Sequence, residues 1–202
     1  CFSRRVECPS REVFADEPTI RRVVANLAIA AVKLSPSGGQ AVLWARADGS
    51  SGVEIGVTSG PVAAGAGKEI ARRVGWILEG DAANGDGMGL GLGVVSALVR
   101  LHLGHVRVGS DGQGRSTISF ALPGCEPAIL LERYFDRLCE DRPGRRQVFA
   151  FRFGWSGESG RQDVWSFLSS MCDPWDLILP VPGEGGLLVT DRRMPSKLIL
   201  RS

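Results

Sequence analysis

Apolar residues recur at a helical spacing in the segment that follows Asp16. Six of them lie at positions i, i+3, i+4, i+7, i+8 and i+11, namely Ile20, Val23, Val24, Leu27, Ala28 and Ala31. This spacing places all six on one face of an α-helix, so the pattern predicts an amphipathic helix packed against a core. Asp16 is a suitable N-cap and Pro18 suits the first turn, whereas the run from Ser35 to Gly39 ends the helix.

A second apolar helical pattern begins after a segment in which glycine alternates with larger residues, from Gly85 to Gly93. Each glycine there loses much backbone entropy on folding. A backbone that closely approaches a ligand is one reason to accept this loss, because free N–H groups at a helix start suit phosphate. A loop that packs tightly at the helix start is the alternative, and the segment alone leaves both open. We expect the helix to run to His102.

Alternating apolar and polar residues predict two β-hairpins. The first joins strands over 40–46 and 53–57 through the turn Asp48–Gly52, and the second joins strands over 106–109 and 116–122. We also expect an edge strand over 6–14, a short helix over 68–78 and a polar lid over 80–87. Pro123 and Gly124 mark a domain boundary, so residues 1–123 are expected to form one α+β domain.

The segment 124–202 repeats this mixture on a smaller scale. Helical spacing over 128–138 and 164–171 alternates with strand-like runs over 148–153, 177–181 and 187–190. The order is helix, strand, helix and a closing hairpin. We therefore predict a second, small α+β module over 124–202.

Composition excludes several classes of protein. The 202 residues carry 24 basic and 22 acidic side chains, and the net charge of +2 favours neither nucleic acid nor a membrane surface as a partner. Five cysteines without a C-x-x-C pair argue against a disulfide framework and a zinc site, and they favour a cytoplasmic protein. The chain starts at Cys1 without an initiator methionine, so we expect a fragment of a longer protein.

Four sequence motifs of the first domain resemble the ATP-binding domain of sensor histidine kinases, which has the GHKL ATPase fold. They are the helix from Asp16 to Ser35, the glycine run Gly87–Leu92, the helix end Val99–His102 and the final strand with its preceding turn, Gly112–Pro123. The resemblance covers Val6 to Pro123 and implies a two-layer α/β sandwich. It implies a nucleotide-binding set, carried over position by position: Asn26, Lys33, Thr58, Gly60, Gly87, Gly89, Leu90, Gly91, Leu92 and Thr117.

This sequence departs from the family pattern where the family holds Mg²⁺ and the base. Ala30 stands where the family has a magnesium-binding Asn, and a methyl group offers no oxygen ligand. Thr58, or Ser59 if the register shifts by one, replaces the Asp that reads adenine, and Val62 and Met88 change the two glycine boxes. The resemblance thus implies ATP with Mg²⁺ as the cofactor, weakened by Ala30 and Thr58. It supplies no metal ligand or catalytic residue.

The family resemblance also implies a place in bacterial two-component signalling. We expect a degenerate kinase domain, a pseudokinase that docks a response regulator, a phosphotransfer protein or a partner kinase. An active histidine kinase domain and a nucleotide or metabolite sensor with a reshaped pocket are the alternatives. Only His102 and His105 are present, and we interpret His102 as structural, so a phosphoacceptor histidine would lie upstream. Relatives of this type dimerise through a helical segment, which we also expect upstream.

The second module resembles a shortened diguanylate-cyclase (GGDEF) domain at one point. The turn from Gly183 to Gly186 lies at a hairpin tip, as that family's signature does. The strand over 148–153 lacks the metal-binding Asp, and the tip lacks the Asp-Glu pair, so the resemblance implies a module without cyclase activity. A hairpin in an unrelated α+β module is the alternative.

Overall fold

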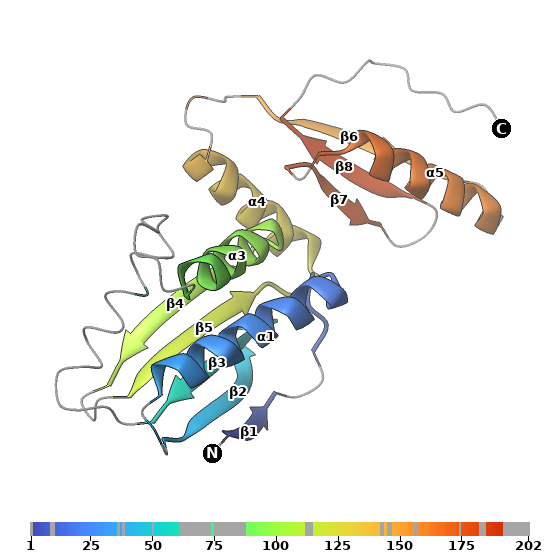
Figure 1. Ribbon diagram of the computed structural model, residues 1–202. Coiled ribbons are helices and arrows are strands. Elements are labelled where there is room, and N and C mark those ends of the chain that lie inside the picture. Colours follow the sequence, from blue (N-terminus) through green and yellow to red (C-terminus); the bar gives the residue numbers. More distant parts are fainter. Residues whose placement is uncertain are drawn as a thin grey trace. The chain divides into compact units, whose positions relative to one another are not determined.

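The computed structural model describes residues 2–8, 11–35, 37, 39–49, 51–60, 74, 88–111, 115–141, 144, 147–155, 157–173, 175–181 and 185–191. The chain forms two compact units, Cys1–Arg133 and Tyr134–Ser202 (Figure 1). Both units combine helices with a β-sheet, which confirms the predicted α+β class. The division between the units falls inside helix α4 (Pro127–Asp141), between Arg133 and Tyr134, and a functional division at Pro123 stays a prediction.

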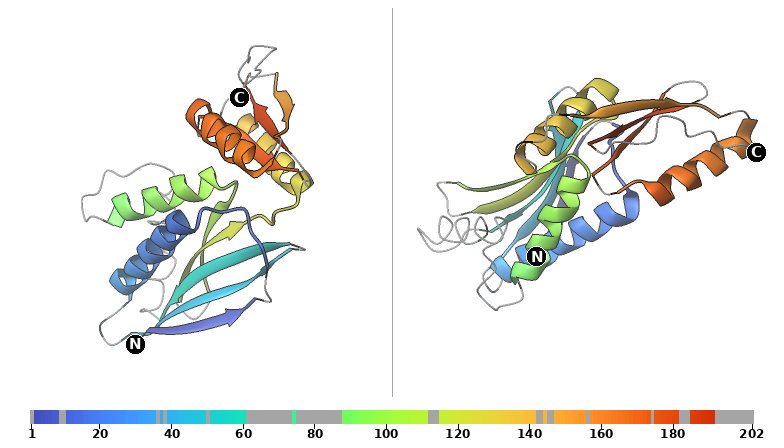
Figure 2. Two further views of the ribbon diagram at one scale, coloured as in Figure 1. Left: turned by 90° about the vertical axis from the view of Figure 1, so that its right-hand side faces the viewer. Right: turned by 90° about the horizontal axis from the view of Figure 1, so that it is seen from above.

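The first unit is a five-stranded sheet with two described helices over one face (Figures 1 and 2). The strand order is β1-β2-β3-β5-β4. The strands are β1 (Phe2–Glu7), β2 (Ala41–Asp48), β3 (Gly52–Ser59), β4 (His105–Ser110) and β5 (Ser116–Leu122). β1 runs parallel to β2, and the other pairs are antiparallel. The helices are α1 (Glu17–Leu34) and α3 (Met88–Leu101).

An apolar core fills the space between the helices and the sheet. The contacting side chains are almost fully buried, and they are Val23 and Leu27 of α1, Val95 and Val99 of α3, and Val57, Ile118 and Phe120 of the sheet. Burying each such side chain stabilises the fold by about 1.5–3 kcal/mol. Successive side chains of a strand point to opposite faces of the sheet. The core residues therefore lie on one face, and the residues between them lie on the other.

Several element boundaries differ from the sequence prediction, and those of β1 and β3 bear most on the candidate site. The predicted strand over 6–14 is wrong: β1 occupies residues 2–7, and Val13 makes only an isolated bridge to Gly124. The sequence itself disfavours a strand over 6–14, because Pro9 lacks the N–H that a ladder hydrogen bond needs. β3 also continues two residues beyond the prediction and includes Thr58 and Ser59. Of the predicted helix over 68–78 only Val74 is described, and the predicted lid over 80–87 lies outside the described residues.

The second unit has the predicted order of helix, strand, helix and hairpin. Its strands are β6 (Phe149–Phe153), β7 (Leu177–Pro180) and β8 (Gly186–Thr190), and α5 (Gly157–Met171) precedes the hairpin. β8 lies in the centre and pairs in antiparallel fashion with both neighbours. Leu188 and Val189 of β8 point to opposite faces and are both buried, so the central strand is covered on both sides.

Candidate functional site

Helix α1 carries the first group of predicted site residues. Asp16 caps the helix, because its carboxylate accepts a hydrogen bond from the backbone N–H of Thr19 at 3.0 Å. Asn26 is half-buried, and Lys33 is exposed in the last turn. Ala30 follows Asn26 by four residues, about one helical turn, and it is 3% exposed and belongs to the apolar core. The position that the family resemblance gives to a magnesium ligand is therefore filled by a core methyl group.

Helix α3 carries the second group. It begins at Met88, inside the glycine run, so Gly89, Leu90 and Gly91 are helical. Leu92 is 1% exposed and belongs to the core, whereas a Cβ atom at Gly91 would meet no other atom within 4 Å. Gly87, the remaining predicted residue of this run, lies outside the described residues. The helical part of the run thus contains a buried side chain, that of Leu92, and a glycine, Gly91, with no side chain of another residue close to it.

The two helices run side by side in opposite directions (Figures 1 and 2). Hydrogen bonds with Thr19 lower the pKa of Asp16 at the start of α1, and His102, directly after α3, adds a smaller charge effect in the same direction. The end of α3 therefore lies near the start of α1. It follows that Ala30 and Lys33, in the last turns of α1, lie toward the glycine-rich start of α3.

The end of β3 divides the remaining candidates between the two faces of the sheet. Val57 points into the core, and Ser59 has the same strand parity, so Ser59 faces the helices. Its hydroxyl donates to the carbonyl oxygen of Ser116 at 3.3 Å, and both serines are 3% exposed. Thr58 and Thr117 pair across the strands on the opposite face, with their hydroxyl oxygens 3.0 Å apart. The structure thus does not bring these threonines together with Asn26.

The requirement for glycine at position 60 is structural and does not involve a ligand. The Gly60 N–H donates to the carbonyl oxygen of Gln40, which closes the open end of the β2–β3 hairpin. A Cβ atom at this position would lie 2.9 Å from that oxygen and 3.0 Å from the Gln40 nitrogen. Such contacts are too short for any side chain, so the close approach of two backbones requires glycine here.

The sequence profile of the histidine kinase-, DNA gyrase B-, and HSP90-like ATPase family, HATPase_c, matches residues 15–125. The match covers more than half of the chain, including α1, α3 and strands β2 to β5. The chain belongs to this family. The resemblance drawn from the sequence motifs is therefore confirmed at the level of the HATPase family.

Two curated relatives of this HATPase chain are adaptive-response sensory kinases named SasA. The protein from Synechocystis sp. is 33% identical over 112 residues, which are 55% of this chain and 29% of the relative. The protein from Rippkaea orientalis is 32% identical over 117 residues, 56% of this chain and 29% of the relative. The chain thus spans less than a third of the length of these relatives.

Two solved structures are also similar to this chain. Full-length ShkA in complex with AMPPNP is 30% identical, with a TM-score of 0.47, and the match covers 61% of this chain and 25% of that chain. The mycobacterial sensor histidine kinase MprB is 25% identical, also with a TM-score of 0.47, over 61% of this chain and 84% of that chain.

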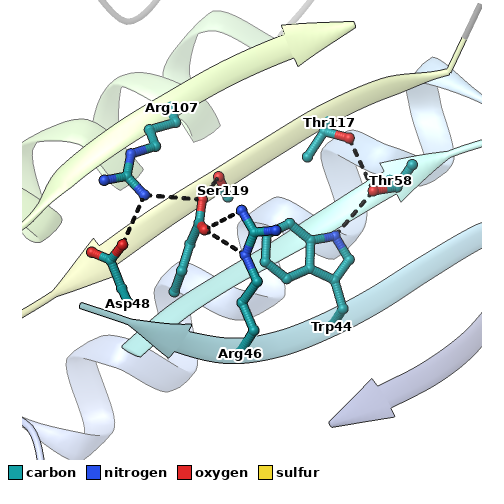
Figure 3. A network of polar contacts seen from close by, with 8 residues as sticks. Trp44, Arg46, Asp48, Thr58, Arg107, Thr117 and Ser119 are labelled. Atoms are coloured by element: carbon teal, nitrogen blue, oxygen red, sulfur yellow. Dashed lines mark hydrogen bonds and ion pairs between the residues drawn. The ribbon is translucent and has the colours of Figure 1, made fainter. Parts of the chain in front are cut away.

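A polar network covers the sheet face opposite the helices of the HATPase unit (Figure 3). Trp44 donates from its indole nitrogen to the Thr58 hydroxyl at 3.0 Å, so this hydroxyl already has a partner. The Trp44 ring lies over Gly56, where a Cβ atom would be 2.5 Å from a ring carbon. This network was not predicted from the sequence, because it depends on which residues the strand register brings opposite one another.

Glu54 is the centre of this network, with only 4% of its side chain exposed. Its carboxylate accepts hydrogen bonds from Ser119 at 2.7 Å and from Arg46 at 2.8 Å, and Arg107 lies 3.4 Å away. Burial by itself raises the pKa of Glu54, but the hydrogen bonds from Ser119 and Arg46 and the two positive charges together outweigh it and lower the pKa. Glu54 is thus held as a carboxylate.

Two further kinds of site are absent from the described residues. None of their helices is long and apolar enough to cross a membrane. No group of three or more His, Cys, Asp and Glu side chains among them is arranged to hold a metal ion. His102, interpreted above as structural, has Nδ1 2.7 Å from the carbonyl oxygen of Leu98, one turn earlier in α3.

Proposed function

We propose that this chain is the nucleotide-binding part of a two-component signalling protein, and that it has lost a ligand needed to bind Mg²⁺. It binds ATP or ADP weakly and without a strong need for the metal, and it acts as a docking or regulatory module. Membership of the HATPase family and the sensory kinases among its relatives support the signalling context. The burial of Ala30 supports the loss of the metal.

Ala30 is the single observation that carries this proposal. In the family that the sequence resembles, this position of the helix supplies an oxygen ligand to Mg²⁺. Here the methyl group packs in the core and is 3% exposed. Mg²⁺ requires oxygen ligands in near-octahedral geometry, and a methyl group supplies none. The nucleotide phosphates would then be held by backbone N–H groups near the start of α3 and by the exposed Lys33.

Ser59, rather than Thr58, is the better candidate to contact the base. Ser59 lies on the sheet face that α1 and α3 cover, whereas Thr58 is held on the opposite face by Trp44 and Thr117. A serine hydroxyl lacks the charge of the Asp in the family pattern. A hydrogen bond to a charged group contributes more than one to a neutral group, so this exchange removes about 1–2 kcal/mol and weakens binding about 5- to 30-fold.

The partner that we propose is a response regulator, a phosphotransfer protein or a second kinase. The relatives named as sensory kinases support this class of partner. They also favour the alternative function, an active histidine kinase domain that uses Mg-ATP to phosphorylate a histidine upstream. We place the chain in the cytoplasm on the basis of its cysteine usage.

Calorimetric titration with ATP and ADP, with and without Mg²⁺, tests the proposal. We expect weak binding to the unmodified chain, with similar affinity in both conditions. Ala30→Asn combined with Ser59→Asp should bind at least tenfold more tightly and only with Mg²⁺. Ala30→Asn combined with Thr58→Asp is the matched control, and it should gain no base contact because Thr58 lies on the opposite face.

Tight, magnesium-dependent binding to the unmodified chain would contradict the proposal and favour the active kinase. A gain with Thr58→Asp but not with Ser59→Asp would contradict the assignment of the base contact. Circular dichroism and thermal melts of each variant establish that it is folded. Absence of any nucleotide binding, even in the repaired variant, would also count against the proposal.

A further inference from the structure

We propose that β6 pairs edge to edge with β6 of a second copy of this chain. The two strands would run antiparallel and join two three-stranded sheets into one of six strands. This inference concerns the second unit and does not depend on the proposed nucleotide site. It assigns a self-association surface to residues 149–153.

The first step is that β6 is an edge strand. The order β6-β8-β7 leaves it with β8 as its partner. Within the described part of the chain, the backbone of β6 forms hydrogen bonds only in the ladder with β8. Half of the backbone N–H and C=O groups of such a strand point away from the sheet and can pair with another strand.

The second step is that β6 lacks the features that protect two of the other three edges of the described sheets; the remaining edge, β4, has one Arg among six residues and no proline. Its sequence is Phe-Ala-Phe-Arg-Phe, with one charge and no proline. The opposite edge of the same sheet, β7, has only four residues and ends in Pro180. In the first unit, the edge strand β1 carries three charged residues among six. Charges, proline and short length are the usual ways of preventing edge pairing, so β6 is an open edge among the described strands.

The third step is that the side chains of β6 are self-complementary. Phe149, Phe151 and Phe153 share one face, while Ala150 and Arg152 are exposed on the other. Antiparallel pairing about a two-fold axis through Phe151 places Phe149 opposite Phe153 of the second copy. It also places each Arg152 opposite an Ala150, so no like charges oppose each other.

The same two-fold axis keeps the phenylalanines of both copies on one side of the enlarged sheet. The rings of Phe149 and Phe151 already stack, with centroids 6.4 Å apart. A two-fold axis perpendicular to the sheet extends this stack across the new interface. Parallel pairing related by an axis along the strands would place the two phenylalanine stripes on opposite faces. The antiparallel arrangement is therefore the one that buries aromatic surface continuously.

Charge substitutions at Ala150 test the pairing, because its side chain is exposed and faces Arg152 of the second copy. Sedimentation of the full chain over a concentration series should show a monomer–dimer equilibrium. Ala150→Lys places like charges opposite each other twice and should weaken the dimer. Ala150→Glu creates two opposite-charge pairs and should strengthen it. The dissociation constant should change about two- to thirtyfold in each direction.

Ser169→Lys and Ser169→Glu are the matched controls. Ser169 is exposed on α5, so these variants change the net charge of the same unit without touching β6. They should leave the dissociation constant unchanged. A chain that stays monomeric at all concentrations would overturn the proposal. A dissociation constant that is unchanged in both Ala150 variants, or that shifts in the same direction in both, would overturn the proposal as well.

Discussion

The two faces of the five-stranded sheet are built from alternate residues of the same strands, yet they are stabilised in different ways. The face under α1 and α3 is a continuous apolar core, and the opposite face is a network around Glu54 and Trp44. Burial is non-directional, whereas hydrogen bonds and ion pairs require particular partners at particular distances. The first face therefore depends on how much apolar surface is covered, and the second on strand register.

The difference also decides which residues reach the candidate site. Ser59 and Thr58 are neighbours in the sequence, but one faces the helices and the other faces the polar network. A shift of one residue in a strand moves every side chain to the opposite face. Which side chains lie on the helix-covered face of this sheet therefore depends on strand parity as much as on residue type.

The largest expected contrast compares neighbouring residues of β5. Phe120→Ala removes a ring that is 0% exposed and should lower the free energy of unfolding by about 3–5 kcal/mol. Ser119→Ala, one residue earlier on the polar face, removes one hydrogen bond to Glu54 and should lower it by about 1–2 kcal/mol. Urea unfolding measures both. Equal losses would contradict the division between the faces.

A smaller effect is expected from Gly56, whose missing side chain makes room for Trp44. In Gly56→Ala the new Cβ would lie 2.5 Å from a ring carbon of Trp44 and 2.7 Å from the Cβ of Ser119. Overpacking of this kind should destabilise the first unit by about 1–3 kcal/mol in urea unfolding. Gly109→Ala is the control in β4, because a Cβ atom there meets nothing within 4 Å.

A double-mutant cycle identifies the cause of the Gly56 effect. Trp44→Val removes the ring that the new methyl group would strike. If the contact explains the loss, Gly56→Ala should destabilise the Trp44→Val background less than the unmodified chain. Additive losses would show that Gly56 is needed for another reason.

The smallest effect concerns Glu54 and acid. Because the pKa of Glu54 is lowered on folding, its contribution to stability is present above its unfolded pKa and is lost as the pH falls through the folded pKa. Glu54→Gln should cost about 1 kcal/mol at neutral pH, since Arg46 and Arg107 are largely exposed and can be hydrated instead. Urea unfolding below about pH 4 should show a smaller difference between the two proteins. An unchanged difference would mean that the carboxylate charge contributes nothing.

Local patterns were sufficient for much of this fold. The helical spacing from Ile20 to Ala31 and the cap at Asp16 predicted α1, and alternation predicted both hairpins of the first unit. Strand parity in the sequence also places Ser59 on the helix-covered face, because it continues the apolar series Val53, Ile55 and Val57. The family resemblance points to Thr58, or to Ser59 if the register shifts by one, and which of them contacts a base stays a prediction.

Contacts between distant strands lay beyond such patterns. Glu54 and Ser119 are 65 positions apart, and their hydrogen bond depends on the register of β3 and β5. Trp44 and Gly56 form a direct cross-strand pair only because the β2–β3 turn sets that alignment. Pro9 in the sequence disfavours a strand over 6–14, but the parallel pairing of β1 with β2 depends on the path of the whole chain.

Glu54 has a consequence for how the sheet opens. Its carboxylate contacts Arg46 of β2, Ser119 of β5 and Arg107 of β4, while Glu54 itself belongs to β3. Detaching any one of these four strands breaks a contact to the same buried charge. We therefore expect local fluctuations in β2 to β5 to be coupled, so that these strands open as one cooperative unit. β1, which makes no contact with this carboxylate among the described residues, can fray from the sheet without disturbing the others.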